Sequence, residues 1–193
     1  MFRMAESEHP DPPDGPGKPT RDAALRLARE WFLRAERIDM RELATALRVG
    51  RTTLYRWFGD RDGLIGEVLA RLADQTWNQL VADDHGTGAE RGLDAIRRFM
   101  HVTAAFPPLR TFAAAEPAAA LRVLMADGRA VSQALRTGFT RALAADGTAP
   151  SAEQIEIMVQ LATALEWAPI VIGEEPAIDR AVALMRHLLD ATA

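Results

Sequence analysis

The chain has 193 residues, of which 48% are hydrophobic and 26% are charged, and its formal net charge is −4. A chain of this size can build one sizeable core, or a small domain joined to a larger one. The absence of cysteine excludes a disulfide framework, a thiol nucleophile and a cysteine-ligated metal, and it fits the cytoplasmic location that we expect.

The charge is unevenly distributed along the chain. Residues 18–62 carry 11 Lys and Arg against seven Asp and Glu, whereas residues 63–193 carry 11 against 16. A basic segment in an acidic protein indicates a local site for a polyanion, although a solvated helix face rich in arginine gives the same pattern. We expect no signal peptide and no membrane partner, because the most apolar stretch, residues 159–172, is short and contains Gln160, Glu166 and Pro169.

The first 19 residues differ in composition from the rest. They contain five prolines with Asp and Gly between them, so we expect residues 1–19 to form a disordered arm. Beyond residue 19, β-branched residues are sparse and no run alternates with a period of two. The sequence therefore predicts an all-α fold.

Four helices are predicted between residues 20 and about 82. Thr20 is a suitable N-cap for the first, Asp39 followed by Glu42 forms a capping box for a short second, and Gly50 caps a short third. A long fourth helix begins near Arg61 and carries one apolar stripe.

The remaining chain is also predicted to be helical. Prolines 107, 117 and 176 stand where helices begin, and Ser151 with Gln154 forms a capping box. The expected helices cover residues 89–105, a short segment from residue 107, residues 117 to about 145, residues 151 to about 173, and residues 176 to about 189.

The first three helices predict a helix-turn-helix. In the third helix only Leu54 and Phe58 are needed for packing, yet the helix also carries Arg, Thr and aromatic side chains. Such an exposed face suits contacts with phosphates and base edges in the major groove of DNA. The alternative is a small structural helix with a polar surface.

The segment from Thr53 to Phe58, TLYRWF, resembles the T-L-Y-x-Y-F signature of the TetR family. Residues 59–64 resemble the loop and helix start that follow this signature, and residues 42–44 match the second helix of the family. Two positions depart from the pattern: Arg48 stands where the family usually has Gly, and Gly50 where it usually has Ser.

The resemblance implies a helix-turn-helix DNA-binding domain at residues 20–65 and a ligand-binding and dimerisation domain at residues 66–193. It implies a homodimeric repressor of a palindromic or near-palindromic double-stranded DNA operator, released by a small apolar effector. Arg51 and Thr52 would face bases, while Thr53, Tyr55 and Arg56 would hold phosphates. Arg61 would hold another, aided by a helix N-terminus. The predicted DNA-binding residues are Arg41, Arg48, Arg51, Thr52, Thr53, Tyr55, Arg56, Trp57 and Arg61.

Residues 112–117 and 172–180 resemble the QsdR-like branch of the family, and Arg56-Trp57 and residues 66–69 agree with this. That branch is associated with control of γ-lactone and acyl-homoserine-lactone breakdown. The resemblance therefore implies a γ-lactone or an acyl-homoserine lactone as the effector.

Large side chains and polar donors on several predicted helices could line an effector pocket, although a plain core uses the same apolar types. The candidates are Trp77, Phe99, His101, Phe112, Met125, Gln133, Phe139, Met158, Gln160 and Trp167. His101 could equally be a hydrogen-bonded inner histidine. We expect Glu156 and Glu166 to face solvent or the rim of a dimer interface, with ligand contact as the alternative.

The two C-terminal helices, residues 152–173 and 177–189, offer apolar surfaces for a two-fold four-helix interface. The four histidines are scattered, and the sequence has neither a nucleophile–base pair nor a cofactor fingerprint. We therefore expect no metal, no cofactor and no enzymatic activity. The alternative to a DNA-binding regulator is an all-α protein-interaction module.

Overall fold

A computed structural model describes residues 19–82, 89–126, 129–144 and 149–190, so nearly all of the arm predicted at residues 1–19 lies outside the described residues. The described part of the chain forms ten α-helices and no strand, which confirms the all-α prediction. The helices are α1 (Arg21–Leu33), α2 (Met40–Leu47), α3 (Arg51–Phe58), α4 (Arg61–Ala82), α5 (Ala89–Ala104), α6 (Pro107–Ala115), α7 (Pro117–Met125), α8 (Ala130–Ala144), α9 (Ala152–Val171) and α10 (Ile178–Asp190).

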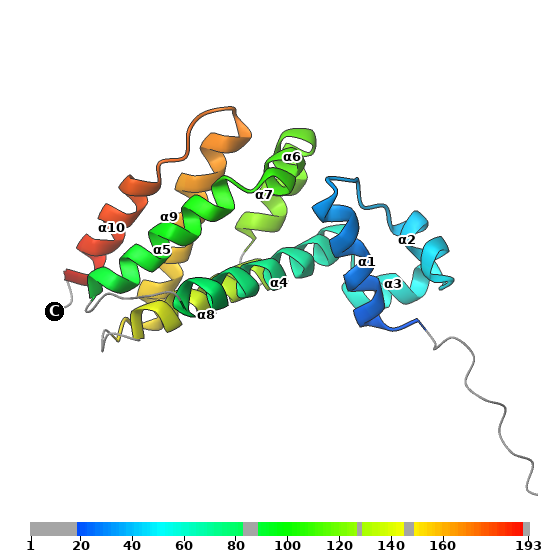
Figure 1. The fold of residues 1–193 in the computed structure, drawn as a ribbon, viewed down its shortest axis with the longest axis horizontal. Coiled ribbons are helices and arrows are strands. Elements are labelled where there is room, and N and C mark those ends of the chain that lie inside the picture. The colour runs from blue at the N-terminus through cyan, green and yellow to red at the C-terminus, as the bar shows by residue number, and fades with distance from the viewer. Residues whose placement is uncertain (1–18, 83–88, 127–128, 145–148, 191–193) are drawn as a thin grey trace, which may run out of the picture.

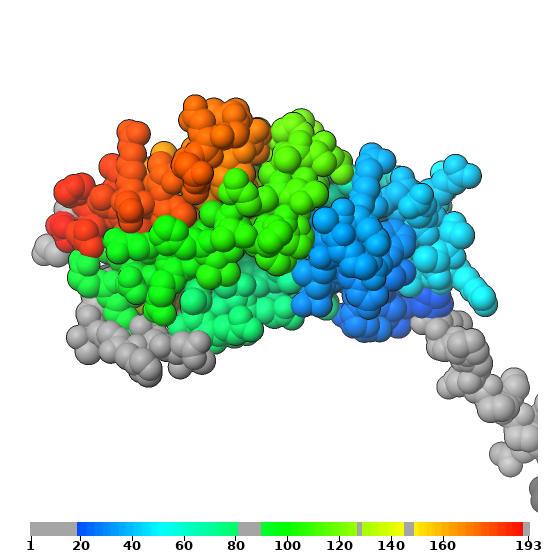
Figure 2. All heavy atoms as spheres, turned by 45° about the horizontal axis from the view of Figure 1, so that its top comes forward, coloured from blue at the N-terminus to red at the C-terminus, as the bar shows by residue number. Residues whose placement is uncertain are grey.

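The molecule is elongated, with a small head at one end (Figure 1). Helices α1, α2 and α3 form the head, and α4 runs from it into a larger body built from the remaining helices. In the body, α4 packs along α8, α5 lies on α8 and α10, and α9 contacts α7 and α10. Figure 2 shows side chains of the α2–α3 part projecting from the free end of the head.

The predicted N-caps Thr20, Asp39 and Ser151 form as local hydrogen bonds, whereas the described residues show no reciprocal Glu42 bond to complete the capping box predicted at Asp39. The Thr20 hydroxyl accepts a hydrogen bond from the Ala23 amide at 3.1 Å, and Ser151 with Gln154 completes a capping box at the start of α9. The Asp39 carboxylate accepts from the amides of the second and third residues of α2 at 2.7 and 3.0 Å. These backbone hydrogen bonds lower the pKa of Asp39.

One predicted helix is divided in two. The sequence predicted a single helix from Pro117 to about residue 145, whereas α7 ends at Met125 and α8 begins at Ala130. The sequence Asp127-Gly128 stands between them, and an Asp-Gly pair interrupts a helix because Gly loses the most backbone entropy there. Both α7 and α8 contact α4 and α9.

The body core centres on Trp77, which is fully buried on α4. Its ring stacks on Phe99 of α5, with centroids 4.2 Å apart, and meets Phe139 of α8 edge-on at 5.7 Å. Gly138 makes this approach of α8 to α4 feasible, because a Cβ there would lie 2.2 Å from Trp77 Nε1. Among the described residues, no helix is long and apolar enough to cross a bilayer.

Candidate functional site

Helix α3 presents a polar face to solvent. Its two inward residues, Leu54 and Phe58, are buried, as the sequence predicted. The side chains of Arg51, Thr52 and Arg56 are exposed, and Tyr55 is 48% exposed although it is a large aromatic residue. Thr53 and Trp57 are half-buried at the margin of this face. The packing of α3 therefore rests mainly on Leu54 and Phe58, while its arginines and Tyr55 remain accessible.

Arginines gather at the junction of α2 and α3. Arg41, Arg48 and Arg51 line one surface hollow between these helices. Among the described residues, none of these three arginines, nor Arg56, forms an ion pair. Unpaired guanidinium groups on one surface create a positive potential that suits phosphate oxygens.

The turn between α2 and α3 holds Arg48 in a left-handed conformation, with φ 55° and ψ 38°. The Arg48 and Val49 amides close the end of α2 by donating to the carbonyls of Thr45 and Ala44. This is the Schellman arrangement, which glycine usually completes because it has no Cβ. The departure from the family pattern at Arg48 therefore places a guanidinium beside the contact face and strains the backbone.

The guanidinium of Arg61 forms hydrogen bonds within the protein. Its Nη1 and Nη2 donate to both carboxylate oxygens of Glu116 at 2.7 Å, and its Nε donates to the Ile38 carbonyl at 2.5 Å. Three of its five N–H donors are thus used within the protein, and a phosphate contact by Arg61 stays a prediction. Glu116 lies between α6 and α7, so this pair joins the head to the body.

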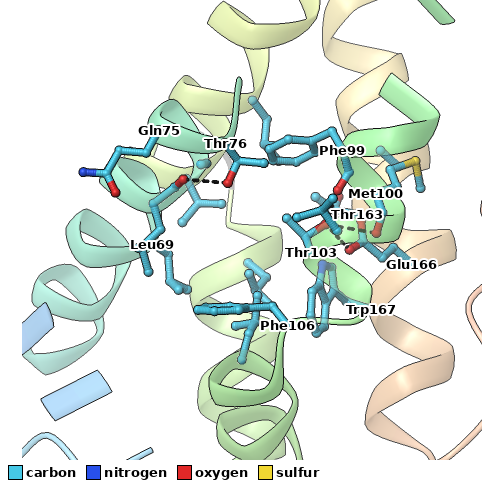
Figure 3. A pocket seen from close by; sticks show the side chains of 18 of the residues that line it. Leu69, Gln75, Thr76, Phe99, Met100, Thr103, Phe106, Thr163, Glu166 and Trp167 are labelled. Atoms are coloured by element: carbon cyan, nitrogen blue, oxygen red, sulfur yellow. Dashed lines mark hydrogen bonds between the residues drawn. The ribbon is translucent and has the colours of Figure 1, made fainter. Parts of the chain in front are cut away.

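The body contains a cavity of about 320 Å³ that reaches the head (Figure 3). This volume is at the lower end of the range for small-molecule sites. Seven helices contribute to its wall. The lining residues are Arg29, Leu33, Leu69, Leu72, Ala73, Gln75, Thr76, Gln79, Phe99, Met100, Val102, Thr103, Phe106, Leu109, Leu124, Val131, Leu135, Phe139, Ala162, Thr163, Glu166 and Trp167.

Three of the predicted pocket residues, Phe99, Phe139 and Trp167, lie on this wall. Trp77 stands behind Phe99 in the core rather than on the wall, and Met158 is fully buried away from it. Phe112 is also absent from the wall. It instead lines a smaller cavity of about 200 Å³ between head and body, where its ring meets Phe32 edge-on at 6.0 Å.

Four predicted pocket residues, His101, Met125, Gln133 and Gln160, are exposed and lie away from the cavity, which corrects their assignment. Met125 is the last residue of α7. The other three stand one or two residues from inward-facing positions, so the 100° turn per residue of an α-helix directs them outward. His101 is therefore not an inner histidine.

The expectation that Glu166 faces solvent or the rim of a dimer interface is wrong. Glu166 is only 3% exposed and lines the cavity from α9. Burial raises the pKa of Glu166 to about 8, and the hydrogen bond from Thr103, 2.7 Å from Oε1, opposes this shift. The sequence contained the signal, because Met158, Ala162 and Glu166 recur at four-residue spacing on one buried stripe.

Two further polar residues, which the sequence pattern did not single out, reach the cavity from the side of the head. Arg29 comes from α1, and its Nη2 donates to Gln75 Oε1 at 3.2 Å. The Nε of Arg29 is buried without a hydrogen-bond partner among the described residues. In Figure 3, Gln75 and Glu166 lie on opposite sides of the cavity, with apolar side chains between them.

Comparison with known proteins identifies the architecture. The family model of the tetracycline repressor-like C-terminal domain matches residues 87–190. The structure of the transcriptional repressor QsdR of the TetR family, from R. erythropolis, is similar with a TM-score of 0.79 and 29% identity, covering 88% of this chain and 94% of that one. No curated protein matches this chain.

Two other structures share the fold at lower identity. A TetR transcriptional regulator from Rhodococcus sp. RHA1 has a TM-score of 0.52 and 21% identity, covering 89% of this chain and 91% of that chain. The TetR family repressor AlkX from Dietzia sp. strain DQ12-45-1b, implicated in biodegradation of n-alkanes, has a TM-score of 0.57 and 18% identity, with coverages of 91% and 96%. Since the family model covers more than half of the chain and QsdR shares its whole architecture, the chain belongs to the TetR family of helix-turn-helix transcriptional regulators and resembles its QsdR-like branch.

Proposed function

We propose that the chain is a homodimeric repressor that inserts α3 into the major groove of a palindromic operator and releases it when a small effector fills the body cavity. The observation that carries this proposal is the arginine group at the junction of α2 and α3, which pairs with no carboxylate of a described residue and lies beside an exposed tyrosine. In the body, by contrast, Arg136 and Arg186 pair with carboxylates. In this proposal, residues 20–65 form the DNA-binding domain and residues 66–193 form the ligand-binding and dimerisation domain.

Within the head, Arg51 and Thr52 at the start of α3 face bases, because the first turn of a recognition helix enters the groove most deeply. Thr53, Tyr55 and Arg56 hold phosphates on either side. Arg41, Arg48 and Trp57 complete the contact surface. Phosphate contacts position the protein, whereas base contacts specify the sequence.

The proposal is tested by fluorescence anisotropy with DNA from upstream of the chain's own gene. Tyr55→Ala or Arg56→Ala weakens binding and reduces the salt slope by about one for each phosphate that is no longer held. Replacing Arg51 instead relaxes sequence preference. Arg26→Ala is the matched control, because this α1 side chain is 63% exposed outside the contact surface. Unchanged affinity and salt slope in Tyr55→Ala would show that the groove assignment is wrong and favour a protein-interaction module.

The dimer forms through α9 and α10. Ile157 on α9 and Leu184 on α10 are large apolar residues left exposed in the single chain, and Leu161 and Leu188 are half-buried near them in the same helices. A two-fold axis between such faces buries them in a four-helix interface. We expect a dimer in solution by analytical ultracentrifugation and a monomer after Leu161→Arg. A wild-type monomer at micromolar concentration contradicts the mechanism.

The effector is a γ-lactone or an acyl-homoserine lactone, as the resemblance to the QsdR-like branch implies. A mainly apolar wall suits an acyl tail, and α4 links the cavity to the head and acts as the lever. Release requires that the effector favour the body conformation that misfits the operator. A thermal-shift screen followed by DNA titration tests this: lactones raise the melting temperature and weaken DNA binding. If only organic cations raise the melting temperature, the lactone assignment is wrong, while the proposed repressor function stands.

A further inference from the structure

The two ends of the cavity are formed by residues from different domains. Arg29 and Leu33 come from α1 in the head, whereas Glu166 and Trp167 come from α9 in the body. Between them the wall is largely apolar, formed by leucines, valines and the rings of Phe99, Phe106 and Phe139. A molecule that fills this cavity therefore contacts both domains at once, and the two ionisable residues of the wall, Arg29 and Glu166, stand at these two ends.

Glu166 offers a hydrogen-bond donor at the inner end. Thr103 Oγ1 lies 2.7 Å from its Oε1 and can donate to it. Thr103 Oγ1 also lies 3.0 and 3.1 Å from the carbonyl oxygens of Phe99 and Met100, either of which can accept its one proton. No described residue forms a hydrogen bond with Oε2 of Glu166, so a proton carried on that oxygen is available to a ligand. Burial favours the protonated, neutral form at neutral pH because it raises the pKa to about 8. The inner end thus suits the carbonyl oxygen of an uncharged group.

Arg29 offers donors at the outer end. Its guanidinium forms no ion pair among the described residues, and its only hydrogen bond is the one that Nη2 donates to Gln75. Its buried Nε lacks a partner in the described part of the chain. A guanidinium keeps its charge at any physiological pH, so this end attracts an acceptor oxygen, most strongly a carboxylate, and repels a cation.

We infer that the effector bridges head and body as an elongated amphiphile with an oxygen acceptor at each end, one accepting from Glu166 and the other from Arg29. This rests on the proposed function in so far as the cavity is the effector site. It adds a selection rule: molecules with two acceptor ends bind more tightly than single-ended ones, and organic cations are excluded. It also means that the ligand can shift the position of the head directly, because it contacts α1.

The test uses the full-length protein and calorimetric titration with simple probes. The two-ended probes are the monomethyl esters of adipic, suberic and sebacic acid, which vary the span between ester and carboxylate. The single-ended probes are decanoate and methyl decanoate, and decylammonium is the cation. We expect the best two-ended probe to bind at least tenfold more tightly than either single-ended probe, and decylammonium to bind weakest.

Variants then assign each end. Arg29→Met should weaken the two-ended probe about tenfold and leave methyl decanoate unchanged. Glu166→Leu should weaken the two-ended probe and leave decanoate unchanged, whereas Glu166→Gln, whose amide still donates, should retain binding. Arg26→Gln on α1 and Glu156→Gln on α9 are matched controls, because these side chains pair with Asp22 and Arg136 away from the cavity.

Three results overturn the inference: no probe binds, single-ended probes bind as tightly as two-ended ones, or decylammonium binds tightest and loses affinity in Glu166→Gln. DNA affinity is measured in parallel for wild type with and without lactones. If one of these three results is found and lactones still release the DNA, the proposed repressor stands and only the two-ended selection rule fails. If the protein does not bind DNA, the proposed function fails, whatever the probes do.

Discussion

Two non-glycine residues in the head adopt left-handed backbone conformations, Ala35 with φ 56° and Arg48 with φ 55°. Each closes the end of a helix, since the Ala35 and Glu36 amides donate to carbonyls at the end of α1 as the Arg48 and Val49 amides do for α2. The same strain occurs in both turns, but only Arg48 lies on the proposed DNA-contact surface, beside Arg41 and Arg51. Comparing variants at Ala35 and Arg48 therefore separates an effect on folding stability from an effect on DNA binding.

Arg48→Gly and Ala35→Gly should each raise the free energy of unfolding by about 0.5–1 kcal/mol, because relief of left-handed strain exceeds the entropy that glycine adds to the unfolded chain. Urea denaturation at fixed protein concentration measures this. DNA affinity should fall in Arg48→Gly and stay unchanged in Ala35→Gly. Equal DNA affinity in both variants contradicts a phosphate contact by Arg48.

Glu166 makes stability depend on pH. Its folded pKa of about 8 exceeds the ordinary value of 4.5, so the folded state holds a proton that the unfolded chain releases. Stability from this group is fully present below pH 4.5 and falls by about 1.4 kcal/mol for each pH unit up to about pH 8.

Glu166→Gln should abolish this dependence, since the amide fills the same space and does not titrate. Urea midpoints at pH 5.5 and 7.5 measure it, with Glu156→Gln as the control on the same helix. We expect wild type and the control to lose stability relative to Glu166→Gln as pH rises. Parallel pH profiles for all three proteins contradict a neutral, buried Glu166.

At the scale of elements, α4 and α8 share the most extensive helix–helix contact in the described part of the body, and Gly138 of α8 lies against Trp77 of α4. Gly138→Ala should lower the free energy of unfolding by about 1–3 kcal/mol, because the new Cβ overlaps the buried Trp77 ring. Gly66→Ala is the matched control: a Cβ there meets Val123 Cγ1 at 3.9 Å, an ordinary contact, and alanine favours the helix. Thermal denaturation measures the change. An equal loss of stability in both variants would contradict the close contact between Gly138 and Trp77.

Sequence patterns predicted helix starts better than helix faces. Thr20, Asp39 and Ser151 cap helices as expected, because a cap is a local hydrogen bond between neighbours in the chain. The pocket wall was predicted less well. Phe99 faces it and His101 does not, because the assignment depends on how helices from distant parts of the chain are rotated against one another. That rotation is set by tertiary packing, which a single sequence does not display.

At the scale of the molecule, ion pairs join the head to the body around the start of α4. Arg61 pairs with Glu116, and Asp62 pairs with Arg122 of α7 at 2.8 Å. No sequence pattern predicts these pairs, because the partners are more than 50 residues apart. Together with Arg29 in the cavity wall, they provide contacts through which the body and its ligand can bias the position of the head.

The central claim is that two copies of α3 read one two-fold operator. Hydroxyl-radical footprinting tests it most directly, on DNA that the full-length protein selects from a random-sequence pool. We predict two protected half-sites related by two-fold symmetry, with centres about one helical turn, roughly 34 Å, apart, and loss of both protections in Arg56→Ala. Selection of no sequence, or one protected site without a two-fold related partner, would contradict the account.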